Sequence, residues 1–579
     1  MRLARALRAR VDPGGAWLAS PDVHLVIQVG RGYRRAEKTN VGASMNTKTR
    51  TSMLIRSFLF LGMALLALEP QLAADQAMWD LAKANSSIHR FSTLFTAHDV
   101  RDRLSTEQGL QAAVDWCRDT AVTQVYLEEF RDGYQAERAA LEKAKARFVG
   151  SGFDVAGCIT TTQLGKSSTG WKTISCYTDQ PTQEKLQAIF EYAASLFNEI
   201  MIDDFWFTDC ACSACETARK EKKVTVGTHS FPVASDSWED YRRELMLRVS
   251  KERVIRPAKR INPQAQLIIK YPQWYDRFHE RGYDVVSESA AFDKIWVGTE
   301  TRDYRDPRWG GTPQYEGIFI MRWLGGIGGA KTGGGWYDWL GTTEKTYVEQ
   351  ARGTILGGAR ESLLFCYGGL QGTTGPENIK ALRREIPELL SLAKQVRVRQ
   401  IAGLAAYKPA NSHPENEPRV FDFVGMLGLP LVPCHEFPSN APAAFFSIHS
   451  LKQLGFESAF RNWLRSGKRA LVTDGLAAKL PKDLTAGRTN VRILAVKGDP
   501  KSLLELSEPE LNDLRAWALQ PFGTTLTGPN KLGYSLFTDG SWVLQNFNDV
   551  PAVAELNGKK IEVPARGWKY EWRSQVPSF

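Results

Sequence analysis

The prediction of the fold starts from residues 199–215, which have the sequence EIMIDDFWFTDCACSAC. This stretch begins with a largely apolar run, which predicts a buried strand. It continues into three carboxylates, Asp203, Asp204 and Asp209, and then into three closely spaced cysteines. Because burying charge inside a strand is costly, these acids predict that the strand ends at a site.

Short apolar runs alternate with amphipathic helical stretches from residue 91 to about residue 400. The expected strands are 91–97, 122–128, 153–160, 199–207, 264–271, 294–299, a weak one near Gly335, and 361–367. The expected helices include 137–149, 182–196, 238–261, 346–356 and 377–396. Eight such units over roughly 300 residues predict an α/β fold, the (β/α)8 TIM barrel. A doubly wound open sheet is the alternative, although the chain has no glycine-rich dinucleotide or P-loop motif.

The remainder of the chain divides by composition. We expect an N-terminal extension plus signal peptide at 1–74, the catalytic barrel at 75–400, an α/β amidotransferase-like domain at 401–527, and a small β-sandwich-like domain at 528–579. Strand-like runs in the third segment are 401–407, 421–424, 443–448, 470–473 and 491–496. The turn signals Asp539-Gly540 and Asn557-Gly558 indicate antiparallel hairpins in the last segment.

Residues 45–74 have the pattern of a secretory signal. Lys48, Arg50 and Arg56 are basic, residues 57–68 are apolar, and small residues follow near a cleavage point around Ala74. The apolar run is short for a transmembrane helix, so no stable membrane span is expected. The pattern predicts a secreted or periplasmic protein, with a single membrane anchor as the alternative.

The composition is that of a globular protein, with 43% hydrophobic and 24% charged residues in a chain of 579. The formal net charge of +10 is concentrated in the first 60 residues. Since no dense basic stripe with interleaved aromatics is present, a nucleic-acid partner is not expected. The 17 tryptophans and 17 tyrosines favour a carbohydrate partner, and a homo-oligomer remains open.

Acidic and aromatic residues follow the expected barrel strands at their C-terminal ends, where barrel active sites lie. The candidate catalytic residues are Asp204, Glu300 and Asp338. The candidate substrate-binding residues are His98, Glu129, Asp203, Trp206, Tyr271, Trp274, Arg302, Trp336 and Tyr337. Glycosidases need two carboxyl groups beside the scissile bond and rings that stack on the sugar. Each acid has an alternative interpretation as a helix cap or a salt-bridge partner.

Three cysteines, Cys210, Cys212 and Cys215, lie too close in sequence for unstrained disulfides. Their spacing predicts a structural Zn2+ site, which needs a fourth ligand. We expect Cys176 in that role, with Cys158 and His229 as alternatives. An oxidised cysteine pair is the competing interpretation.

An acidic fourth strand followed by Cys-x-Cys-x2-Cys, with an earlier cysteine after the third strand, resembles the architecture of the family 42 β-galactosidases. The resemblance covers roughly residues 90–579 as architecture, and it implies a structural zinc on these cysteines and a glycosidase barrel followed by a small α/β domain and a small β domain. That family has Asn-Glu where this chain has Asp203-Asp204, and a glutamate nucleophile where this chain has Trp336-Tyr337-Asp338. Other retaining glycosidase barrels pair an Asp on strand four with an acid on strand six, which would match Asp204 with Glu300.

The sequence thus predicts a secreted glycoside hydrolase that cleaves O-glycosidic bonds of an oligo- or polysaccharide with a carboxylate pair. A non-catalytic glycan-binding barrel is the alternative from another functional class. A metal-dependent deacetylase is a third, and the eight histidines lack the spacing of an open metal site.

Overall fold

The computed structural model describes residues 77–302, 312–372 and 374–574. The predicted N-terminal extension and signal peptide at 1–74 therefore lie outside the described residues. Within the described part, no helix is both long and apolar enough to cross a membrane.

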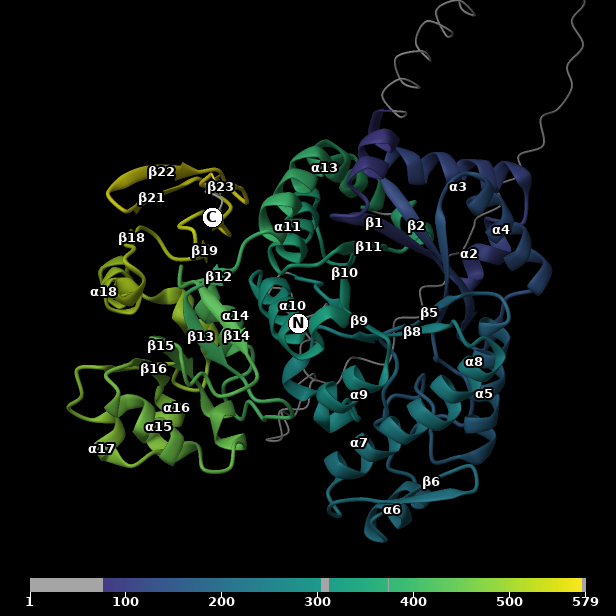
Figure 1. The fold of residues 1–579 in the computed structure, drawn as a ribbon, viewed down its shortest axis with the longest axis horizontal. Coiled ribbons are helices and arrows are strands. Elements are labelled where there is room, and N and C mark those ends of the chain that lie inside the picture. Colours follow the sequence, from purple (N-terminus) through teal and green to yellow (C-terminus); the bar gives the residue numbers. More distant parts are fainter. Residues whose placement is uncertain (1–76, 303–311, 373, 575–579) are drawn as a thin grey trace, which may run out of the picture. The chain divides into compact units, whose positions relative to one another are not determined.

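Eight parallel strands form a closed barrel, because β1 pairs with both β2 and β11. The strands are β1 (Arg90–Phe95), β2 (Val122–Arg131), β4 (Asp154–Ile159), β5 (Glu199–Ile202), β8 (Gln266–Tyr271), β9 (Lys294–Gly298), β10 (Thr332–Asp338) and β11 (Glu361–Phe365). Figure 1 shows these strands with their covering helices, from purple through teal to green. The predicted TIM barrel is confirmed.

Helices connect consecutive strands and cover the barrel. They are α3 (Glu107–Asp119), α4 (Arg138–Gly150), α5 (Gln180–Ala194), α7 (Trp238–Val249) with α8 (Arg256–Ile261), α9 (Val285–Ala291), α10 (Glu316–Gly328), α11 (Glu344–Leu356) and α13 (Gly375–Arg397). Several of these helices are preceded by a residue whose side chain accepts a hydrogen bond from a backbone N–H of the first turn. Thr106, Asp179 and Ser237 are such residues.

The seventh strand was the weakest prediction, because its sequence Thr-Gly-Gly-Gly resembles a loop. Strand β10 needs these glycines to pass the Trp296 side chain of β9. A Cβ atom on Gly333 would lie 2.3 Å from the Trp296 ring, and one on Gly334 would lie 2.6 Å from its Nε1. The glycines thus make room for a large residue inside the barrel.

The barrel interior has its own apolar cluster, separate from the layer between strands and helices. Its members are Leu94, Tyr126, Ala156, Cys158, Met201, Ile268, Trp296, Trp336 and Leu363. Since side chains alternate along a strand, residues two positions further on face the same axis at the C-terminal mouth. This alternation determines which polar residues can meet there.

A five-stranded parallel sheet follows the barrel, in the order β14-β13-β15-β16-β17. Its strands are β13 (Leu404–Tyr407), β14 (Leu431–Cys434), β15 (Ala443–Phe446), β16 (Arg469–Thr473) and β17 (Val491–Leu494). The helices that accompany it include α14 (Val420–Gly425), α15 (Phe456–Arg465) and α18 (Glu508–Leu519). The strand expected at 421–424 is wrong, because this buried apolar run is helix α14. A short apolar run has no periodicity that separates a strand from a buried helix.

Two small antiparallel sheets lie in the C-terminal part of the described chain, and the antiparallel hairpin of β6 (Lys223–Val226) and β7 (His229–Pro232) follows β5. One of the two C-terminal sheets contains β12 (Ile401–Ala402), β19 (Leu532–Phe537), β20 (Trp542–Asn546) and β23 (Trp568–Glu571), and the other β18 (Leu526–Thr527), β21 (Ala552–Leu556) and β22 (Lys559–Val563). The strand expected at 401–407 is divided between two sheets at Gly403. This residue has φ of 144° and leaves no room for a Cβ atom beside the carbonyl of Pro430.

Candidate active site

A buried charged network fills the barrel mouth on the side of β2, β4, β5 and β8. Asp203 pairs with Lys270 and, at 2.7 Å, with Arg131, and it accepts a hydrogen bond of 2.9 Å from Thr160. Arg131 also pairs with Glu128 at 2.8 Å. Although burial opposes ionisation, Lys270 and Arg131 hold the pKa of Asp203 below its ordinary value. Asp203 is therefore a paired, ionised carboxylate.

A second group of polar residues lies at the ends of β9 and β10. The Glu300 carboxyl is 3.3 Å from the Arg302 guanidinium and accepts a 2.8 Å hydrogen bond from Trp336 Nε1. Arg302 also pairs with Asp338 at 2.5 Å. Burial raises the pKa of Glu300 to about 7, with a further contribution from Asp338, against the opposing effect of Arg302. A buried carboxyl of this kind can hold a proton near neutral pH.

Asp204 lies in the turn just after β5, and it is half-buried. Tyr283 donates a 3.0 Å hydrogen bond to its backbone carbonyl, which fixes the turn. Burial first, and then the charges of Asp203 and Glu300, raise the pKa of the Asp204 carboxyl. Asp204 is therefore within electrostatic reach of both Asp203 and Glu300.

The structure brings together five predicted residues at this mouth: Asp203, Asp204, Glu300, Arg302 and Asp338. Trp336 joins them through Glu300, and the Lys270 ammonium lies 3.9 Å from the centre of its ring. Lys270 is not among the predicted residues, and of the neighbouring acids Glu128 and Glu129 the prediction selected Glu129. A lysine in the apolar strand Gln-Leu-Ile-Ile-Lys-Tyr was the signal for Lys270, since alternation points it inward with Ile268.

Other predicted residues point away from the mouth into the layer between strands and helices. Trp206 is buried against Tyr177 and donates to Ser250, and the Tyr271 hydroxyl contacts Ser289. Tyr337 packs against Tyr347. Glu129 is buried beside Gln135, and burial raises its pKa. Glu128, its neighbour in sequence, is the residue that faces the barrel axis.

Two predicted residues follow strands of the barrel, His98 in the short helix α2 (Ala97–Asp102) after β1 and Trp274 in the loop after β8. His98 stacks on Tyr134, with ring centres 5.5 Å apart. Trp274 is half-buried and packs against Phe207 and beneath the Arg281 guanidinium.

The four cysteines come together in a compact cluster beside this site. The Sγ atoms of Cys176, Cys212 and Cys215 are 3.6–3.8 Å apart, and all four possible ligand atoms lie within 4.8 Å of one another. A tetrahedral Zn–S4 centre has sulfur–sulfur edges of roughly 3.8 Å, given Zn–S bonds of about 2.3 Å. These separations exceed a disulfide bond, and all eight cysteines are unpaired in the described residues. The donor set thus fits a structural metal. The alternative ligand Cys158 lies inside the barrel, and His229 is exposed.

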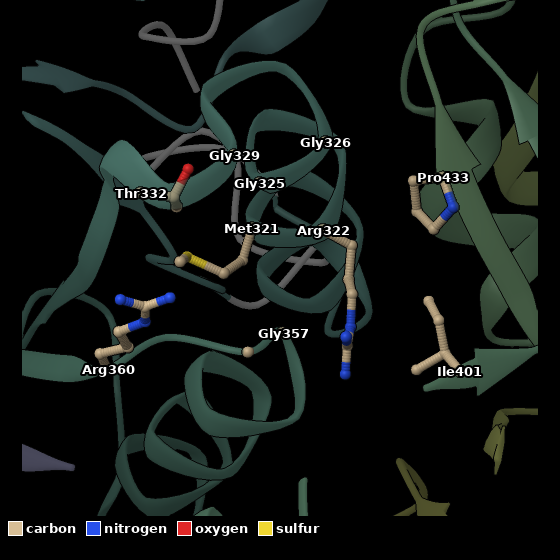
Figure 2. A pocket seen from close by; sticks show the side chains of 11 residues that line it. Met321, Arg322, Gly325, Gly326, Gly329, Thr332, Gly357, Arg360, Ile401 and Pro433 are labelled. Carbon is tan, nitrogen blue, oxygen red and sulfur yellow. The ribbon is translucent and has the colours of Figure 1, made fainter. Parts of the chain in front are cut away.

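A cavity lies away from the mouth, beside α10. Its lining includes Met321, Arg322, Thr332, Arg360 and Ile401 (Figure 2). The volume of this cavity is about 300 Å³. Thr332 begins β10 and Arg360 precedes β11, so this cavity lies at the amino ends of the strands. Since barrel chemistry takes place at the carboxyl ends, we assign it no part in the candidate site.

Residues 76–385 match the family described as "Probable glycosyl hydrolase, catalytic domain". The chain belongs to this family. The match covers more than half of the chain and contains every strand of the barrel, together with Asp204, Glu300 and the four cysteines. The predicted membership of a glycosyl hydrolase family is confirmed, whereas the resemblance to family 42 in particular stays a prediction.

A relative from Saccharolobus solfataricus, the uncharacterized protein SSO3021, is 26% identical over 359 residues. The alignment covers 56% of this chain and 57% of that protein, so the match spans little more than half of the relative. Among solved structures, the α-L-fucosidase isoenzyme 2 from Paenibacillus thiaminolyticus aligns with a TM-score of 0.58 and 9% identity. That alignment covers 84% of this chain and 100% of the fucosidase, and at this identity it shows a shared fold.

Proposed function

We propose that this chain hydrolyses glycosidic bonds at the barrel mouth, with Glu300 as proton donor and Asp204 as the second carboxylate. The observation that carries this proposal is the environment of Glu300, whose buried carboxyl has a pKa raised to about 7. A general acid must hold its proton at the working pH and release it to the leaving oxygen.

In the proposed reaction the bond between the anomeric carbon and the leaving oxygen breaks as Glu300 transfers its proton to that oxygen. Asp204 either attacks the anomeric carbon or deprotonates the water that attacks it. While Glu300 carries the proton, its charge no longer opposes ionisation of Asp204, and Lys270 and Arg131 then favour the Asp204 carboxylate. The proposed reaction thus needs one proton on this pair of carboxyls, and it assigns that proton to Glu300.

The test of Glu300 uses leaving groups of different basicity. Glu300→Gln removes the acid, so hydrolysis of alkyl glycosides should decrease about 1,000-fold, within the usual range for general acid catalysis. Dinitrophenyl glycosides need little protonation, so their hydrolysis should decrease much less. An equal decrease for both substrates would contradict this role.

The test of Asp204 is chemical rescue. Asp204→Gly should lose turnover, and added azide should restore cleavage if Asp204 is the nucleophile, giving a glycosyl azide whose anomeric configuration identifies the role. Glu184→Gln, at an exposed position on α5, is the matched control and should keep full activity. Should Asp204→Gly retain normal turnover while Asp338→Asn loses it, the second carboxylate would be Asp338.

A non-catalytic glycan-binding barrel is the competing function. It requires aromatic rings at the mouth more than carboxyls, yet Trp206, Tyr271 and Tyr337 pack into the core. A panel of aryl glycosides decides between the two, because a binding protein would hydrolyse none of them.

We further propose that Cys176, Cys210, Cys212 and Cys215 bind a structural zinc ion. Four thiolates leave no open coordination position, so the metal would fix the loop and take no part in bond cleavage. Export of the chain is proposed from the signal pattern at 45–74, and N-terminal sequencing of the protein from its source would test it.

A further inference from the structure

Trp171, which has no role in the proposed reaction, is exposed on the side of the barrel that holds the candidate active site. Trp171, in the loop between β4 and α5, is 45% exposed, and it is the single exposed tryptophan of the described residues. Loops that follow the carboxyl end of a strand surround the mouth of a TIM barrel. Exposure of a single aromatic side chain is not by itself a sign of binding, so the surroundings of Trp171 decide its role.

Aromatic rings connect Trp171 with the turn that carries Asp204. The Trp171 ring centre lies 5.5 Å from that of Phe205, which directly follows Asp204 in the chain. It lies 6.1 Å from the Phe207 ring, and the two planes are inclined by only 31°. Phe207 in turn contacts Trp274 at 5.4 Å. A continuous apolar strip therefore extends from the candidate carboxylate to the exposed indole.

The backbone around Trp171 is fixed by Asp209. One carboxylate oxygen accepts the Trp171 N–H at 2.8 Å, and the other accepts the Ser168 hydroxyl at 2.5 Å. Gly170 lets this carboxylate approach, because a Cβ atom there would lie 2.5 Å from Asp209 Cγ.

A second attachment joins the same loop to the cysteine cluster. The Thr169 hydroxyl accepts the Ala211 N–H at 2.7 Å and lies 3.8 Å from Cys210 Sγ. The loop is thus held at Ser168, Thr169 and the Trp171 N–H, so the exposed indole is carried by a fixed backbone. Preorganised apolar surface of this kind favours binding, because little conformational entropy is lost.

We propose that Trp171 is the stacking platform of a sugar-binding subsite next to Asp204. Its ligand is a pyranose ring that presents its C–H face to the indole, which is how a flat aromatic ring binds a sugar through its hydrophobic surface. The proposal depends on the proposed hydrolysis and names a substrate contact that the predicted rim of Trp206, Tyr271 and Tyr337 does not supply.

The kinetic test compares Trp171→Ala and Trp171→Phe in the full chain, with the 4-nitrophenyl glycoside that the wild type hydrolyses fastest. We expect Trp171→Ala to raise KM about tenfold with less than a twofold change in kcat, since about 1.4 kcal/mol of stacking corresponds to a factor of ten. Trp171→Phe should recover part of the loss. Trp517→Ala, at a half-buried tryptophan of α18, should leave KM unchanged. An unchanged KM in Trp171→Ala would overturn the proposal.

A binding test without turnover uses the Glu300→Gln chain labelled with 5-fluorotryptophan. The Trp171 resonance is assigned by its loss in a Trp171→Phe version, and the glycosides of the panel are titrated in turn. We expect a saturable shift of this resonance and none for Trp517. Saturation that leaves the Trp171 resonance unmoved would overturn the subsite. A wild-type chain that hydrolyses no glycoside overturns the proposed hydrolysis instead, and the titration then tests stacking separately.

Discussion

The indole of Trp336 donates a 2.8 Å hydrogen bond to the carboxyl of Glu300 inside the barrel mouth. Both side chains are buried, so this bond acts where water does not screen it. It stabilises the ionised form of Glu300 and therefore lowers its pKa. Burial has the larger, opposite effect, so the resulting pKa of Glu300 is about 7.

The pH profile should report this bond. Hydrolysis requires protonated Glu300, so kcat/KM should decrease as pH rises above about 7. Trp336→Phe removes a hydrogen bond to the carboxylate, which raises the pKa and moves the alkaline limb to higher pH by about one unit. Steady-state kinetics between pH 5 and pH 9 measures the shift, and an alkaline limb that moves to lower pH would contradict the assignment.

Asp203 should be the carboxylate on which stability depends most. Asp203→Asn leaves Lys270 and Arg131 buried with less compensation, and breaking a buried pair of this kind costs about 3–5 kcal/mol. Urea denaturation at neutral pH measures the loss. As a control, Glu415→Gln breaks the half-exposed pair with Lys479 and should cost about 1 kcal/mol or less.

The stability difference between wild type and Asp203→Asn should depend on pH in a defined way. The folded-state pKa of Asp203 is depressed, so its stabilisation is complete above the ordinary value of 3.8 and is lost as pH falls through the lower folded value. The stability difference between wild type and Asp203→Asn should therefore be constant above about pH 5 and decrease in more acidic solution. A difference that grows on acidification would rule out this pairing.

The barrel could be predicted from the sequence because each strand is an apolar run followed by a helix with a recognisable first turn. The direction in which side chains point at the strand ends could not be predicted from the sequence. Asp203 and Asp204 are adjacent, and β5 ends at Ile202, so alternation applies to Asp203 and stops at the turn that carries Asp204. Trp206 and Tyr271 lie near the same strand ends, yet they enter the core.

The buried charged network around Asp203 could not be predicted, for a related reason. Lys270 is an inward residue of an otherwise largely apolar strand, and its partner Asp203 lies 67 residues away in the sequence. Trp171 could not be predicted as a site residue, because a loop sequence carries no periodicity and the backbone of Trp171 is held by Asp209, 38 residues further along the chain.

Metal removal should destabilise the chain and loosen the loop of Trp171. Dialysis against a chelator should lower Tm by at least about 5 °C, because structural zinc contributes folding free energy directly. Elemental analysis should give one zinc per chain, and Cys215→Ser should lose it. Cys434→Ser, at a cysteine of β14 outside the cluster, should retain the metal. Equal metal content in both variants would refute the four-cysteine site.

Gly170→Ala should separate the orientation of Trp171 from its presence. A Cβ atom at this position would meet the Asp209 carboxylate at 2.5 Å, so the carboxylate must move from the Trp171 N–H that it accepts. We expect KM to rise towards the value for Trp171→Ala while zinc content and kcat stay near those of the wild type. Gly150→Ala is the matched control, because a Cβ atom there meets no atom within 4 Å. If Gly170→Ala and Gly150→Ala had the same KM, the contact between Asp209 and the Trp171 loop would have no part in substrate binding, even if Trp171 itself had one.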